Sequence, residues 1–393
     1  MINVKGFKFS GISCGLKKSK KKDLGLIISS NECISHAVFT KNKVMAAPLI
    51  ISKEIINKNK LRAIIVNSGN ANACTGDEGI RNVKSVINQA AKVSGLPKNN
   101  FFISSTGIIG EQLDVKKINT KLSKLFKDAK PNKSVDFAEA IRTTDKYIKI
   151  ESTKIKIGNK TGTLLGIAKG AGMIHPNMAT MLCYLITDIK INKSTFKKFI
   201  NYATKNSFNS ISVDGDTSTN DTVLGMSNGL AGNEEINLKS KSAKKIYGEI
   251  EKIFYNLAKK IVADGEGSTK ICKIIVKGAK TEKDSKKIAN RISTSLLFKT
   301  ALFGSDPNWG RIIAAVGSSG VNYIDQRKID IYINKKNLVK NGLGKKISSF
   351  FNRTMKNKEI EIIVDLKIGK ASSFVLTNDL GHEYIDINSL YRT

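Results

Sequence analysis

Residues 63–97 read AIIVNSGNANACTGDEGIRNVKSVINQAAKVSGLP and place a strand-like run directly before a helical pattern. The apolar run from Ala63 to Asn67 has the length and composition of a buried strand. From Asp77 to Ser94 the apolar residues recur at helical spacing, and Gly95 and Pro97 supply the stop. These patterns predict a strand over 63–67 and a helix over 77–94.

The same alternation of short strand-like runs and longer helical patterns continues on both sides of this stretch. The expected strands are 24–29, 37–40, 101–105 and 147–157, and the expected helices are 193–205, 241–262 and one that carries Ile118, Leu122, Leu125 and Phe126 on a single face. Helix and strand alternate again from about residue 270 to the C-terminus, which favours a domain boundary there. The residues alone therefore indicate an α/β or α+β class.

Composition narrows the class of protein further. The 393 residues are 40% hydrophobic, enough for a packed core. The longest apolar run, Met178–Thr187, falls short of the roughly 18 residues that cross a bilayer, so we expect no membrane partner. The N-terminus lacks the apolar core of a signal peptide, and the five cysteines form no CxxC pair. A cytoplasmic protein with buried, reduced thiols is expected.

The formal charge is +33 at pH 7, from 66 Lys and Arg against 33 Asp and Glu. Such a balance is a first indication of nucleic-acid binding. Only eight of the basic residues are Arg, however, and the lysines are spread along the chain. The densest run, Lys17–Lys22, is interpreted as a solvated turn. We expect no nucleic-acid partner, and a nucleic-acid-binding protein stays as the alternative that steep salt-dependent association would reveal.

Several common functional motifs are incomplete in this sequence. Lys169–Ile174 contains a GxG but lacks the third glycine and the later acidic residue of a dinucleotide site. Asp214–Asn220 begins like a calcium loop, but Thr219 and Gly225 stand where that loop needs Gly and Glu. No P-loop motif is present, and the three histidines are far apart. We expect no metal and no cofactor.

Three segments rich in glycine and in hydroxyl or charged residues remain: Ser104–Gly110, Lys169–Thr180 and Asp264–Lys270. A strand that runs into a glycine turn exposes backbone N–H groups and lets a substrate approach closely. Isolated Thr residues are nevertheless mostly caps, and Lys–Glu pairs are mostly salt bridges. The residue types alone do not choose between these roles.

Five longer strings resemble a known family: Asn67–Gly76, Ser105–Gly110, Lys169–Leu182, Ser212–Thr222 and Ser305–Arg311. They closely resemble the ornithine acetyltransferase (glutamate N-acetyltransferase) family of arginine biosynthesis, and the resemblance spans essentially the whole chain. It implies an α/β fold of layered sheets and helices of the DmpA/ornithine-acetyltransferase type, with a C-terminal α/β domain from about residue 270. It also implies a heterotetramer of two α and two β chains.

The resemblance implies that the chain cuts itself between Ala179 and Thr180. Residues 1–179 would form an α chain that carries the oxyanion hole, and residues 180–393 a β chain that begins with the nucleophile. The new α-amine of Thr180 has an ordinary pKa of about 7.7 to 8.0, so it can act as the base for its own hydroxyl.

The implied reaction is ping-pong transfer of an acetyl group from N-acetylornithine to glutamate through acetyl-Thr180. Thr106 and Gly107 match the oxyanion hole of the family. The matching substrate-binding positions are Thr143, Lys169, Thr180, Glu266, Asn388 and Thr393. Some members of the family also use acetyl-CoA as donor, and the sequence leaves this open. The alternative enzyme is a self-cleaving aminopeptidase or amidase of the related superfamily, in which water accepts the acyl group.

Overall fold

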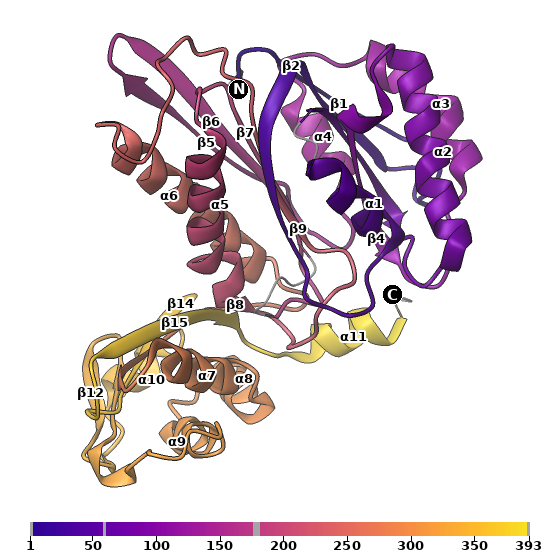
Figure 1. The fold of residues 1–393 in the computed structure, drawn as a ribbon. Coiled ribbons are helices and arrows are strands. Elements are labelled where there is room, and N and C mark those ends of the chain that lie inside the picture. The colour runs from indigo at the N-terminus through magenta and orange to yellow at the C-terminus, as the bar shows by residue number, and fades with distance from the viewer. Residues whose placement is uncertain (1–2, 58–59, 176–180, 391–393) are drawn as a thin grey trace.

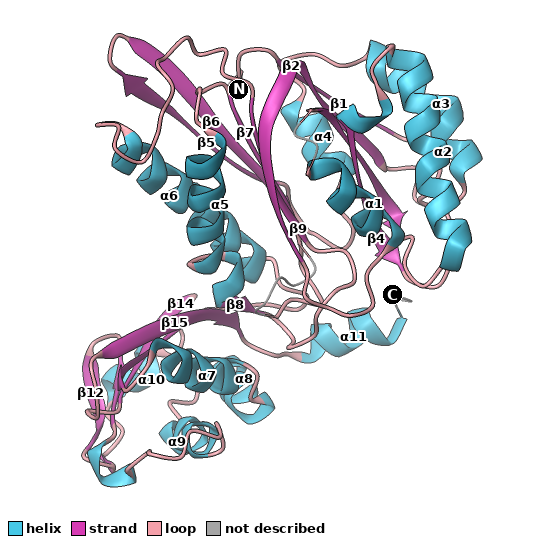
Figure 2. Ribbon diagram, viewed as in Figure 1, coloured by secondary structure: helices cyan, strands magenta, loops and turns pink. Residues whose placement is uncertain are grey.

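The computed structural model describes residues 3–57, 60–175 and 181–390 of the chain. Within them, two mixed β-sheets are layered with helices, as Figures 1 and 2 show. The expected α/β class is confirmed. Among the described residues, no helix has both the length and the apolar character needed to cross a membrane.

The first sheet is built from strands that lie far apart in the sequence. Its order is β4 (Phe101–Ile108), β3 (Leu61–Asn70), β2 (Leu24–Phe39), β9 (Thr222–Ser227), β7 (Leu182–Thr187), β6 (Lys160–Lys169) and β5 (Lys149–Ile157), with β1 (Phe7–Ile12) paired to β2. The second sheet runs β13 (Leu343–Gly344), β12 (Lys336–Lys340), β11 (Asp330–Ile333), β14 (Glu359–Asp365), β10 (Ile271–Ala279), β15 (Ala371–Asn378) and β8 (Ile211–Ser212).

Helices cover the sheets in groups. Those of the first sheet are α1 (Ala47–Ile56), α2 (Gly76–Ser94), α3 (Val115–Lys127), α4 (Ser134–Ala140), α5 (Lys193–Lys205) and α6 (Ala243–Ala263), and the later ones are α7 (Glu282–Ser293), α8 (Leu296–Phe303), α9 (Trp309–Gly317), α10 (Ser349–Thr354) and α11 (His382–Leu390). Figure 1 shows α1, α2 and α3 on one side of the first sheet and α5 and α6 on the other. Helix α11 returns from the second sheet to the lower end of the first.

Strands β6 and β7 are buried on both faces, which explains their nearly continuous apolar sequences. Leu165 and Tyr184 belong to the core that also holds α2 and α3. Their neighbours Leu164 and Cys183 point to the opposite face and pack in the core that holds α5 and α6. Because successive side chains of a strand alternate between faces, two cores share these strands.

The expected strands at 24–29 and 37–40 are wrong as separate elements, because both belong to the single strand β2. Its first half pairs with β3 and its second half with β9, with a shift of register between Ile28 and Cys33. Ser30, Asn31 and Glu32 are exposed at that shift. Their polar side chains break the apolar pattern although the backbone stays extended.

The other predicted elements agree more closely with the structure. Helix α5 has the expected bounds, and α2 ends at Ser94 before Gly95, whose φ of 72° is the left-handed conformation of a helix stop. Strand β4 continues three residues beyond the expected 101–105. The expectation of buried thiols holds for four cysteines but is wrong for Cys74, which is exposed in the loop before α2.

Candidate active site

A cavity of about 180 Å³ lies at the ends of β4 and β6 and is also lined by residues of α11. Six residues predicted from the resemblance line it: Thr106, Gly107, Thr143, Lys169, Glu266 and Asn388. They come from β4, from the loop before β5, from β6, from the loop after α6 and from α11. The other predicted positions, Ala179, Thr180 and Thr393, lie outside the described residues.

The end of β4 requires glycine at position 107. Gly107 has a φ of +137°, a conformation that side chains disfavour. A Cβ at this position would lie 2.5 Å from the backbone nitrogen of Asn70 and would also overlap Gly69. The register between β3 and β4 shifts at the same point. Glycine therefore lets the two strands approach closely at the mouth of the cavity.

Asn220 holds this strand end in place. Its Nδ2 donates to the carbonyl oxygen of Ser105 at 2.9 Å and to that of Ala71 at 2.7 Å. The side chain is buried, so both hydrogen bonds are protected from water. Asn220 thus fixes the backbone directly before Thr106 and Gly107, the residues of the predicted oxyanion hole.

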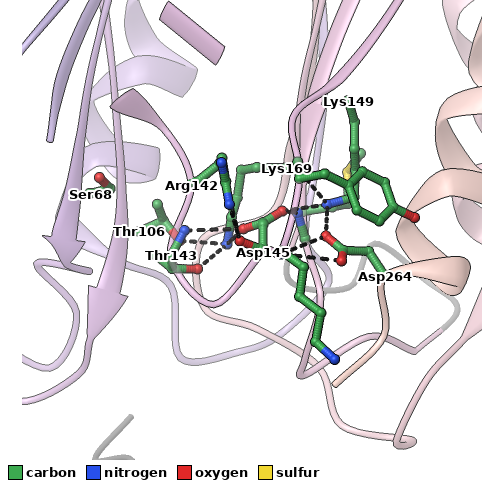
Figure 3. A network of polar contacts seen from close by, with 12 residues as sticks. Ser68, Thr106, Arg142, Thr143, Asp145, Lys149, Lys169 and Asp264 are labelled. Atoms are coloured by element: carbon green, nitrogen blue, oxygen red, sulfur yellow. Dashed lines mark hydrogen bonds and ion pairs between the residues drawn. The ribbon is translucent and has the colours of Figure 1, made fainter. Parts of the chain in front are cut away.

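Lys169 ends β6 and is 2% exposed. Its Nζ donates to Thr143 Oγ1 at 2.7 Å and to Thr106 Oγ1 at 3.4 Å, as Figure 3 shows. Burial lowers the pKa of this ammonium, and the nearby carboxylate of Asp145 opposes the shift. The cavity therefore holds a cation that is poorly solvated and lies within reach of two hydroxyl groups.

Glu266 supplies a negative group to the same cavity. Asn388 Nδ2 donates to Glu266 Oε2 at 3.0 Å, and the Glu266 backbone N–H donates to the carbonyl oxygen of Ala171. Gly172 lies against the carboxylate, since a Cβ on it would be 2.6 Å from Glu266 Cδ. Helix α11 and the glycine-rich end of β6 together position Glu266.

We expect Gly172→Ala to displace the Glu266 carboxylate, because the added methyl group overlaps it, and thereby to raise the KM of a substrate that this carboxylate contacts. The effect should be roughly 10-fold, the size expected for weakening a hydrogen bond to a charged group. Steady-state kinetics measure it. Gly248→Ala in α6 is the matched control, since a Cβ there meets nothing within 4 Å and alanine favours a helix. An equal loss in both variants would contradict the expectation.

Two buried carboxylates hold the described residues on either side of 176–180. Asp214 accepts hydrogen bonds from the backbone N–H groups of Met173 at 2.5 Å and Ile174 at 2.8 Å. Asp221 accepts one from the N–H of Met181 at 3.0 Å. Burial raises the pKa of Asp214 to about 6 and raises that of Asp221 as well. The residues that flank Ala179 and Thr180 in the sequence are thus anchored at both ends.

Several residues of the site escape the sequence analysis. Asp214, Asn220 and Tyr384 line the cavity, and Asp145, Lys149 and Asp264 form a buried charge network behind it (Figure 3). Asp214 and Asn220 stand inside a matching string, and Asp264 begins one of the three glycine-containing segments. Tyr384, Asp145 and Lys149 lie outside all of these stretches. Lys149 and Asp264 stand 115 positions apart, and no local pattern pairs them.

A buried cavity with few, convergent charged groups at the strand ends of an α/β sheet is typical of an enzyme that binds a small polar molecule. The ArgJ family matches residues 8–393, and the chain belongs to this family.

Two related proteins match essentially the whole length of the chain, and a solved structure matches about half of it. The arginine biosynthesis bifunctional protein ArgJ of Thermotoga neapolitana is 42% identical over 400 residues, covering 100% of both chains. A glutamate N-acetyltransferase of Methanocaldococcus jannaschii is 41% identical over 402 residues, covering 99% of this chain and 97% of the other. The crystal structure of ArgJ from Bacillus halodurans is 36% identical with a TM-score of 0.52, covering 54% of this chain and 100% of that chain.

Proposed function

We propose that this chain transfers an acetyl group from N-acetylornithine to glutamate, giving ornithine and N-acetylglutamate, by a ping-pong mechanism through acetyl-Thr180. Membership of the ArgJ family supports this function. The observation that carries it is the meeting, in one cavity, of six matched residues from five separate segments.

The proposal begins with cleavage of the peptide bond between Ala179 and Thr180. The Thr180 hydroxyl attacks the Ala179 carbonyl carbon, the C–N bond breaks, and water then hydrolyses the ester. The products are a carboxylate on Ala179 and a free α-amine on Thr180, whose pKa near 8 makes it a base at neutral pH.

Sheet topology is compatible with such a cut. Strand β9 follows Thr180 in the sequence and pairs with β2, and β7 likewise follows it and pairs with β6. The order β2-β9-β7-β6 therefore places strands from after residue 180 between strands from before residue 179. Backbone hydrogen bonds and two shared cores would hold the two chains together without the peptide bond.

In the transfer itself, the Thr180 hydroxyl attacks the acetyl carbonyl and ornithine departs with the proton that the amine relays. Thr106 and Gly107 stabilise the oxyanion of both tetrahedral intermediates. Glutamate then attacks the acetyl ester and leaves as N-acetylglutamate. No group outside the chain and its two substrates is required.

The charges of the cavity suit amino-acid substrates. Lys169 pairs with the α-carboxylate, and Thr143 supports it through the hydrogen bond to Nζ. Glu266, held by Asn388, pairs with the ammonium group. We assign the carboxylate of Thr393, the chain end, to an amine of the substrate as well.

We expect Lys169→Met to raise the KM for N-acetylornithine about 10- to 100-fold with a smaller change in kcat, because a charge-assisted hydrogen bond to the carboxylate is lost. Glu266→Gln should act in the same direction. Initial-rate kinetics give both constants. Lys146→Met is the control, since Lys146 forms an exposed ion pair with Glu383. An unchanged KM in both Lys169→Met and Glu266→Gln would refute the assignment of Lys169 to the carboxylate and Glu266 to the ammonium group.

A product assay separates the proposed activity from the alternative. With N-acetylornithine and glutamate present, the transferase forms N-acetylglutamate and ornithine in equal amounts. A self-cleaving amidase or aminopeptidase would release free acetate and leave glutamate unchanged. A second reaction with acetyl-CoA as the sole donor decides whether the chain also has that activity.

We further propose an assembly of two α and two β chains in the cytoplasm. Light scattering of the purified, cleaved protein tests the assembly, which should have twice the mass of the 43.0 kDa chain. A mass of one chain would overturn the proposed tetramer.

A further inference from the structure

Asp145 lies behind the cavity and contacts two of the residues that line it. Its Oδ2 accepts a hydrogen bond from the Thr143 backbone N–H at 3.1 Å and lies 3.8 Å from Lys169 Nζ. Its Oδ1 accepts one at 2.7 Å from the N–H of Gly170, next to Lys169. The carboxylate is fully buried and is not among the described residues that line the cavity. It can therefore act on a substrate only through its neighbours.

Lys149 and Asp264 add one further charge of each sign beside Asp145 and Lys169, as Figure 3 shows. Lys149 Nζ lies 2.7 Å from Asp145 Oδ1 and 2.5 Å from Asp264 Oδ2, and the three side chains are fully buried. The carboxylates of Asp145 and Asp264 thus balance the ammonium groups of Lys149 and Lys169. Arg142, also close by, binds the backbone carbonyl of Asp145 and not its carboxylate.

Electrostatics favour a charged Asp145. Burial raises the pKa of this carboxyl, but Lys169, Lys149 and the Gly170 N–H together lower it by more. The pKa of Asp145 is therefore well below its ordinary value. In turn, burial lowers the pKa of Lys169 and Asp145 opposes that shift. Asp145 thereby favours the charged form of Lys169, whose Nζ lies 3.8 Å from Asp145 Oδ2. Lys149 and Asp264 make no hydrogen bond to Lys169 or Thr143 among the contacts described.

We propose that Asp145 is a positioning residue for substrate binding: it fixes Lys169 and Thr143 so that their ammonium and hydroxyl groups receive the substrate carboxylate. This inference rests on the proposed function. Lys149 and Asp264 balance its charge and stabilise the fold without setting the geometry of the cavity. The competing explanation is that all four charges serve stability alone.

Charge-balanced double variants separate the two explanations, since removing one partner of a buried pair is itself strongly destabilising. Asp145→Asn with Lys149→Met removes one charge of each sign and takes Asp145 away from Lys169. Lys149→Met with Asp264→Asn also removes one of each sign but leaves Asp145 in place. Both are compared with the wild type by thermal unfolding and by initial-rate kinetics with N-acetylornithine.

We expect the variant that lacks Asp145 to raise KM about 10- to 100-fold, with kcat changed less, the loss typical of a weakened charge-assisted hydrogen bond. The variant that keeps Asp145 should change KM less than about threefold at a comparable melting temperature. Equal KM values in the two variants would overturn the inference. A wild type without transferase activity would instead overturn the proposed function.

A second comparison decides the matter even if the first pair of variants folds poorly. Asp145→Asn combined with Lys169→Met again preserves the charge balance and leaves the Lys149–Asp264 pair. Asp145 is proposed to place the Lys169 ammonium, and this ammonium in turn bonds the Thr143 hydroxyl. The KM of this double variant should therefore match that of Lys169→Met alone within about threefold. If the two substitutions instead multiplied each other's effect on KM, Asp145 would act independently of Lys169, and the inference would fail.

Discussion

We expect Thr180→Ala to yield a single intact chain of 43.0 kDa that has lost nearly all acetyl transfer. In the proposed mechanism one hydroxyl serves both as the nucleophile that cuts the chain and as the nucleophile that accepts the acetyl group, so both activities should be lost together. The loss of transfer should be about 10⁴-fold or more, as found when a covalent nucleophile is removed. A denaturing gel, mass spectrometry and the N-acetylglutamate assay measure the two effects.

Thr180→Ser is the matched control, because serine keeps the hydroxyl on the same backbone. It should be cut and should retain transfer at a reduced rate. Activity in Thr180→Ala would refute the nucleophile. Fully active wild-type protein that contains only intact chain would refute the requirement for a free α-amine.

Thr106→Val should lower kcat about 100- to 1,000-fold, the usual effect of removing one oxyanion donor. Valine has nearly the shape of threonine, so the buried position at the end of β4 stays filled. The hydroxyl that it removes lies 3.4 Å from Lys169 Nζ in the cavity. The effect should appear in kcat more than in KM, because the oxyanion exists only after the substrate has been attacked.

Two controls separate this effect from a loss of structure. Thr106→Ser restores the hydroxyl and should recover most of the activity. Thr120→Val changes an exposed threonine of α3, whose hydroxyl bonds to its own helix, and should be neutral. If Thr106→Val kept a wild-type kcat, the backbone N–H groups alone would form the oxyanion hole.

Local elements were largely predictable where one pattern runs without interruption. Helix α2 follows its apolar spacing to the glycine stop, and α5 has its expected bounds. Strand β2 was not predictable, because Ser30, Asn31 and Glu32 interrupt the apolar pattern while the backbone continues from β3 to β9. Hydrogen bonds between strands define that element, and neighbours in the sequence do not report them.

The candidate site divides in the same way. The sequence was sufficient to select Thr106, Gly107 and Lys169, because they stand in strings that match a family. The strand that runs into a glycine turn also indicated locally that position 107 needs glycine. Asp145 could not be selected in this way, since the role proposed for this loop residue depends on its contact with Lys169 at the end of β6. The ion pair of Lys149 with Asp264 bridges 115 residues and is equally invisible to any local pattern.

The sequence by itself determined the fold class, most of the helices, the family and the residues offered for catalysis. These follow from the spacing of apolar residues, from the glycines that end helices and strands, and from the matching strings of residues. All of these signals lie within short stretches of the chain. Only the tertiary structure decided which strands interleave, which side chains meet in the cavity and which buried charges support Lys169. Such contacts depend on distance in space, and chain segments more than a hundred residues apart become neighbours only when the sheet closes around a common core.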